Sequence, residues 1–135
     1  MADEIQRVQY FYTEVADKAG EGAKVLGALR EAGIDLKAFV AFPKGRRAQL
    51  DFVPTDQAAF KDAAKKAKIK LVGPKTCFLI QGDDRTGAVA EIESKLSGAK
   101  INITALQGIA AGAGRYGAIL WVKPRDVNKA AKLLL

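Results

Sequence analysis

The sequence predicts an α+β fold made of two tandem ferredoxin-like modules, each with the element order strand, helix, strand, strand, helix, strand. Two observations lead to this prediction. The chain repeats itself with a constant offset, and each copy alternates β-branched or aromatic segments with segments of helical periodicity. Glycines and prolines fall between these segments, where turns are expected. The second copy lacks an obvious fourth strand.

The internal repeat pairs identical residues that lie 67 positions apart. The pairs are Asp17 and Asp84, Gly20 and Gly87, Ala23 and Ala90, Leu29 and Leu96, Ala32 and Ala99, Ile34 and Ile101, and Ala38 and Ala105. After a three-residue insertion the match resumes 70 positions apart, as in Leu50 and Leu120. This period is too long for a solenoid unit. We therefore expect a first module over residues 1–73 and a second over residues 74–135.

Composition sets broad limits on the class of protein. Apolar residues make up 49% and charged residues 27% of the chain, which is ordinary for a globular protein. The start of the chain has no basic and apolar signal pattern, and the single Cys77 fits a strand core in a reducing compartment, so a cytoplasmic location is expected. The net charge of +7 fits either a solvated surface or a surface that attracts anions.

In the first module, β-branched and aromatic residues predict strands, and apolar residues three and four apart predict helices. The expected strands are 8–15, 34–42, 47–53 and 69–72, and the expected helices are 21–32 and 56–67. Gly33 should stop the first helix, and Thr55 or Asp56 should cap the second.

The second module repeats this plan until the chain ends. The expected strands are 76–81, 101–109 and 117–122, and the expected helices are 88–96, closed by Gly98, and 126 onwards. No residues follow the last helix to form a fourth strand. The edge of the strand 76–81 is therefore expected to be unpaired within its own module, and such an edge is normally covered.

Alternation along the strands separates two faces of the second sheet. If Leu120 and Val122 point at the helices, their neighbours point to the opposite face. The residues of that outer face are Ile119, Trp121, Cys77 and Leu79, and the corresponding first-module residues are Gln49, Asp51, Tyr10 and Tyr12. Because an apolar face should not remain in water, Trp121, Ile119 and Leu79 are expected at an interface. Modules of this size are only marginally stable alone, so we expect close packing and a homodimer or a higher oligomer.

The repeated turn and strand motifs carry a resemblance to a known family. The turns are Asp17-Lys18-Ala19-Gly20 and Asp84-Arg85-Thr86-Gly87, and the strand openings are Gly33-Ile34-Asp35-Leu36 and Lys100-Ile101-Asn102-Ile103. Over about residues 5–134 this pattern resembles the ACT domain. The resemblance implies a free-standing tandem ACT protein without a catalytic domain, which acts as a sensor of an amino acid or a similar small anion and regulates another protein.

The turn chemistry agrees with this resemblance. Glycine allows close backbone approach, the first helical turn offers free N–H groups, and an Asn side chain both donates and accepts hydrogen bonds. The resemblance implies a ligand between two modules, bound by Asp84, Arg85, Thr86, Gly87 and Asn102 of the second copy and by Asp17, Gly20 and Glu21 of the first copy. The first copy has Asp35 in place of the Asn. The alternative is that Gly20 and Gly87 only form tight turns and that Asp84 caps a helix.

The chain is poorly equipped for catalysis. It contains no histidine, no cluster of cysteine and histidine, and no phosphate-binding loop before a helix. Asp83 and Asp84 are adjacent carboxylates in a turn, and the glycines of residues 108–117 lie between two strands. We therefore expect no enzymatic activity, no cofactor and no metal.

RNA binding is the alternative function, because RNA-recognition modules share this topology. Residues 116–121 partly match the first of their two sheet motifs, and residues 77–79 loosely match the second. That function requires Phe78 and Tyr116 on the open face of the sheet. The ACT resemblance instead places Phe78 under the helices and Trp121 outside, so the positions of these side chains distinguish the two functions.

Overall fold

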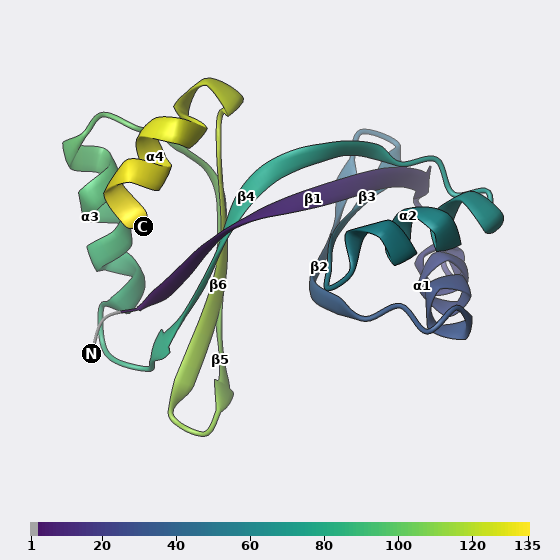
Figure 1. Cartoon of the computed structure of the whole chain (residues 1–135), viewed down its shortest axis with the longest axis horizontal. Helices are drawn as coiled ribbons and strands as arrows, with labels where there is room; N and C mark the ends of the chain where they lie inside the picture. The colour runs from purple at the N-terminus through teal and green to yellow at the C-terminus, as the bar shows by residue number, and fades with distance from the viewer. Residues whose placement is uncertain (1–2) are drawn as a thin grey trace. The chain divides into compact units, whose positions relative to one another are not determined.

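The computed structural model describes residues 3–135, and its α+β architecture is shown in Figure 1. The strands are β1 (Glu4–Ala16), β2 (Leu36–Lys44), β3 (Arg47–Pro54), β4 (Val72–Asp83), β5 (Ile103–Gly112) and β6 (Arg115–Val122). The helices are α1 (Glu21–Glu31), α2 (Gln57–Lys66), α3 (Ala88–Gly98) and α4 (Val127–Leu134), and a 3₁₀ turn, Pro124–Asp126, precedes α4. No helix in this part of the chain is long and apolar enough to cross a membrane.

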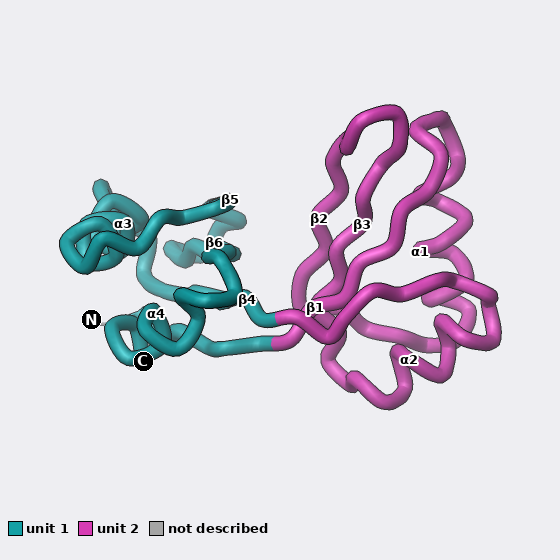
Figure 2. Tube along the Cα trace, turned by 90° about the horizontal axis from the view of Figure 1, so that it is seen from above, with its two compact units in different colours: residues 1–8, 76–135 teal, residues 9–75 magenta. Residues whose placement is uncertain are grey.

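The chain forms two compact units, coloured separately in Figure 2. Unit 2 contains residues 9–75, and unit 1 contains residues 3–8 together with residues 76–135. The strand order is β2-β3-β1-β4-β6-β5, so β1 and β4 are neighbours and each contributes one part to each unit. Unit 1 therefore has the start of β1, then the end of β4, β6 and β5. Unit 2 has the start of β4, then the end of β1, β3 and β2.

The second copy contributes no fourth strand of its own, and the start of β1 takes that place in unit 1. Residues 4–8, at the start of β1, lie beside β4 in unit 1 and cover the edge that the sequence left unpaired. Asp3 contacts Gly82, and Gly73 lies against the Tyr10 carbonyl oxygen, so the two strands run antiparallel. Ile5 packs against the core of unit 1. These residues lie within the predicted first module, just ahead of its first predicted strand at 8–15.

The predicted boundary between the two modules lies within β4. β4 continues without a break from Val72 to Asp83, so the expected division between residues 73 and 74 falls inside a strand. The segment 69–71, expected to be a strand, is not one. Its first residue, Ile69, donates its N–H to the Ala64 carbonyl and closes α2.

Both copies end their first helix in the same way, which shifts the following strand by two residues. Ile34 N–H donates to the Leu29 carbonyl at 3.0 Å, and Ile101 N–H donates to the Leu96 carbonyl at 2.9 Å. Gly33, with φ of 73°, and Lys100, with φ of 60°, make the turns. As a result, β2 begins at residue 36 and β5 at residue 103. The second helix of unit 2 is capped by Asp56, whose side chain accepts from the Ala59 N–H at 3.0 Å.

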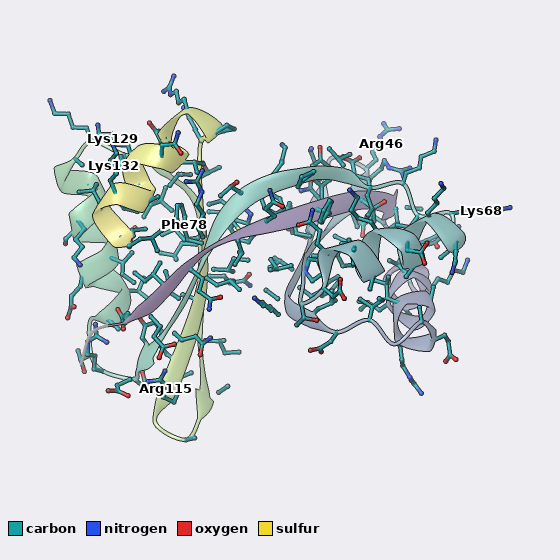
Figure 3. The ribbon with its side chains drawn as sticks, viewed as in Figure 1. Arg46, Lys68, Phe78, Arg115, Lys129 and Lys132 are labelled. Carbon is teal, nitrogen blue, oxygen red and sulfur yellow. The ribbon has the colours of Figure 1, made fainter. Side chains whose placement is uncertain are left out.

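The faces of the second sheet follow the predicted alternation. Phe78, Ile80 and Leu120 belong to the core beneath α3 and α4, and Phe78 points from β4 toward these helices (Figure 3). Ile119 and Trp121 are buried but lie outside that core. A separate core in unit 2 joins its two helices to its sheet and contains Phe11, Leu29, Leu50, Phe52, Phe60 and Ala63.

These positions contradict the RNA-binding alternative in the form that the sequence suggested. Phe78 is 0% exposed and Tyr116 is 7% exposed, and both lie in the core under the helices. Neither ring is available to stack on a base.

Candidate functional site

The turn between β4 and α3 forms the candidate site in unit 1. β4 ends at Asp83, and Gly87 stands at the N-cap of α3 with φ of 80°. Gly20 stands at the N-cap of α1 with φ of 89° in the equivalent turn. Both glycines adopt a left-handed conformation that other residues reach only with strain. Because Gly87 is the N-cap, the idea that Asp84 caps this helix is wrong, and no side chain at the N-cap competes for the N–H groups of the first helical turn.

An open groove of about 430 Å³ lies beside this turn. Its lining residues come from the turn, from the first turn of α3, from β5 and from β6: Asp84, Arg85, Gly87, Ala88, Val89, Ala90, Gly108, Ile109, Ala110 and Tyr116. The groove thus brings together three of the predicted site residues, Asp84, Arg85 and Gly87. Thr86 and Asn102 do not line it.

Arg85 is already engaged by groups of the protein itself. Its guanidinium donates to both carboxylate oxygens of Asp3, at 3.0 and 3.3 Å. It also donates to the Asp83 carbonyl at 3.1 Å and to the Glu91 carboxylate at 3.0 Å. The side chain of Arg85 is 31% exposed and that of Asp3 is 9% exposed. The cation of the groove is therefore neutralised within unit 1.

Asp84 differs from Arg85. Its backbone N–H donates to the Gly114 carbonyl at 2.9 Å, and its side chain makes no ion pair with any residue of the range 3–135. Asp84 is exposed at the mouth of the groove. Its carboxylate is therefore free to receive a positively charged group.

Asp3 was not predicted as a site residue, and Tyr116 was considered only as a base-stacking residue of the RNA-binding alternative. The hydrogen bond from Arg85 lowers the pKa of the Asp3 carboxyl, while burial and the neighbouring Asp3 raise the pKa of the Tyr116 phenol. The Tyr116 hydroxyl is buried, and no group among the described residues meets hydrogen-bond geometry with it. Asp3 precedes the region of the repeat and gave no signal of its own, and the only signal at Tyr116 was the partial match of residues 116–121 to an RNA-recognition motif.

Asn102 lies at the other end of α3 from the turn. It follows the C-cap at Ala99, is exposed, and directly precedes β5. α3 contains 11 residues, which at 1.5 Å per residue separates its two ends by roughly 16 Å. Within unit 1, the turn and Asn102 therefore cannot contact one small ligand.

The first-copy residues have different surroundings from those of the second copy. Glu21 is paired with Lys18 at 4.0 Å and with Lys24 at 3.6 Å. It borders a different depression of about 370 Å³, next to Lys24, Lys68 and Lys70, which neither Asp17 nor Gly20 lines. Among the residues expected at an interface, Trp121 and Ile119 are 9% and 7% exposed, and Leu79 is partly exposed.

No family model matches this sequence, and no curated protein matches it. Solved structures do match. Protein BT0572 from Bacteroides thetaiotaomicron is 16% identical, with a TM-score of 0.82 over 96% of this chain and 88% of that protein. The ligand-free regulatory subunit of aspartate kinase from Thermus thermophilus is 20% identical, with a TM-score of 0.65 over 99% and 95%.

The regulatory subunit of aspartate kinase from Thermus flavus is also 20% identical, with a TM-score of 0.61 over 97% of this chain and 92% of that subunit. At these identities the likeness concerns the fold alone. The chain has the α+β fold of aspartate kinase regulatory subunits, over nearly its whole length.

Proposed function

We propose that this protein is a non-catalytic regulatory protein of tandem ACT type that binds an amino acid in the groove beside Asp84–Gly87. The observation that carries this proposal is the groove itself. It combines the first turn of an α-helix, without a side-chain cap, with an unpaired carboxylate at Asp84. The fold shared with regulatory subunits supports a regulatory role.

The polar groups of the groove favour a zwitterion over a simple anion. The N–H groups and dipole of the first turn of α3 favour a carboxylate. The free Asp84 carboxylate favours an ammonium group. An α-amino acid carries both groups on its α-carbon, and Arg85 becomes available to its carboxylate only in competition with Asp3 and Glu91.

A second copy of the chain would bring Asn102 to this ligand. β5 is an edge strand, and its residues 108–110 line the groove. If two copies pair antiparallel along β5 about Leu106, residue 102 of one copy lies opposite residue 110 of the other. The proposed site is therefore composed of the turn of one copy and the Asn102 of its partner, and a homodimer is the functional form.

The remaining parts of the proposal concern organisation and location. We propose that the sequence repeats divide near residues 73 and 74, while β1 and β4 each contribute to both units. Ligand occupancy would be transmitted to a regulated partner protein in the cytoplasm, without a cofactor.

A thermal-shift screen against the amino acids and common nucleotides tests the function. We expect at least one amino acid to raise the melting temperature and no nucleotide to do so. Asp84→Asn and Asn102→Ala should each weaken that amino acid about tenfold, the effect of losing one charge-assisted hydrogen bond. Ser94→Ala, an exposed position of α3 that neither lines the groove nor lies on β5, is the matched control. Stabilisation by no amino acid, or unchanged binding in Asn102→Ala, would reject the proposed site.

A further inference from the structure

The Asp3 carboxylate lies in a pocket shaped to hold it. An added Cβ at Gly82 would collide with the Asp3 carboxylate and would lie 2.9 Å from the Tyr116 ring. Arg85 closes the pocket with two hydrogen bonds to Asp3. Any side chain at position 82 would occupy the place of the Asp3 carboxylate, so this arrangement depends on a glycine in β4.

Asp3 directly precedes the strand segment that completes the sheet of unit 1. Residues 4–8 lie beside β4, while the pairing of β1 with β3 begins only at Phe11. The segment is therefore an edge with one neighbouring strand in unit 1. Its other side-chain attachments are Ile5, packed against the core, and Arg7, which donates to Asn128 at 3.0 Å. A short edge segment of this kind opens at low energetic cost.

Asp3 and the groove share Arg85. Arg85 lines the groove and is the only cation among the described lining residues. Four of the five N–H donors of Arg85 are used by Asp3, Asp83 and Glu91, so a carboxylate that accepts two hydrogen bonds from Arg85 must displace Asp3 or Glu91. Displacing Glu91 and displacing Asp3 would have different effects, because Glu91 belongs to α3 whereas Asp3 is attached to the edge segment, residues 4–8.

We propose that Asp3 is an internal competitor for the groove, and that a carboxylate arriving at Arg85 displaces it and loosens residues 4–8 from β4. This inference rests on the proposed function, because residues 4–8 would be the part of unit 1 that responds when a ligand occupies the groove. Because β1 continues from unit 1 into unit 2, a change at residues 4–8 alters a strand that both units use.

Hydrogen exchange of the amides of residues 4–8 tests the competition. Asp3→Asn keeps the size of the side chain and removes its charge, so exchange of these amides should accelerate about tenfold, as expected for loss of a charge-assisted pair. Glu91→Gln is the matched control, because it removes the other carboxylate on Arg85 without touching the segment. Its exchange at residues 4–8 should equal that of the wild type.

Sodium acetate serves as the carboxylate probe, compared with sodium chloride at the same ionic strength. Acetate should accelerate exchange of residues 4–8 in the wild type and should have no further effect in Asp3→Asn. Equal exchange in acetate and chloride, or wild-type exchange in Asp3→Asn, overturns the inference. The proposed function fails separately, through the amino-acid screen and Asn102→Ala, so the two results are distinguishable.

Discussion

At the scale of single residues, Asp3 and Asp51 are two carboxyl groups whose pKa values shift in opposite directions. Arg85 donates two hydrogen bonds to Asp3 and lowers its pKa from 3.8. Asp51 is 5% exposed on the sheet of unit 2, and burial raises its pKa even though Gln49 donates to it at 2.8 Å. The difference lies in the partner, since an amide compensates a buried charge less than a guanidinium does.

Replacing Asp3 by Asn and replacing Asp51 by Asn should therefore change the free energy of unfolding with opposite dependence on pH. A lowered folded-state pKa stabilises the folded protein above the unfolded value, near 3.8, and this stabilisation is lost as the pH falls through the folded pKa. Asp3→Asn should cost about 1 kcal/mol at pH 7 and nothing in strong acid.

Asp51 has the reverse linkage. Because its folded pKa is raised, the protein loses stability as the pH rises from the unfolded value through the folded one. Asp51→Asn should therefore stabilise the protein at pH 7 and lose this advantage below about pH 4. Urea unfolding of both variants across this range measures the effect, and parallel pH profiles for the two variants would contradict the assignment.

At the scale of elements, the start of β1 and the end of β4 lie together at a position that only glycine can occupy, Gly82. Gly82 has no space for a Cβ because of Asp3 and Tyr116, whereas the nearest atom to a Cβ at Gly117 is the Ile80 carbonyl oxygen at 3.7 Å. Both glycines lie in strands of the same sheet. The two glycines therefore differ in the space available for a side chain and not in secondary structure.

Gly82→Ala should expel the Asp3 side chain and destabilise unit 1 by about 1–3 kcal/mol, the usual cost of overpacking. Gly117→Ala should be neutral or slightly stabilising, because it reduces the freedom of the unfolded chain without a clash. Chemical denaturation compares the two. If both variants unfold at the same denaturant concentration, Asp3 does not occupy the place described here.

Most elements could be predicted from the sequence because their signals are local. Apolar periodicity located all four helices, and alternation placed Leu120 and Trp121 on different faces. The start of β1 could not be predicted, because Glu4 and Arg7 give residues 4–8 a polar pattern and their partner strand lies far along the chain. Asp84 and Gly87 predicted the candidate turn because they lie close together in the sequence. The contact of Arg85 with Asp3 joins residues far apart in the sequence and was not predicted.

At the scale of the whole molecule, the two edge strands of the sheet order are β2 and β5. β2 carries Lys37, Pro43 and Lys44, the kind of residues that prevent strands from pairing with other chains. β5 has the sequence ITALQGIAAG, with no charge and no proline, and most of its residues are exposed. The chain therefore protects one edge and leaves the other able to pair.

We expect the protein to dimerise through β5. Two copies that pair antiparallel about Leu106 place Gln107 of each copy opposite Ala105 of the other and diagonal to the other Gln107, so Gln107→Lys should place two like charges in the interface and shift the chain toward the monomer. Ala41→Lys, at an exposed position of β2, is the matched control and should leave the dimer intact. Sedimentation velocity at several concentrations reports the oligomeric state. A wild-type monomer at high concentration, or a Gln107→Lys dimer as tight as that of the wild type, would show that β5 does not join the copies. In that case Asn102 could not reach the groove by this route, and the amino acid would have to be bound by the turn alone.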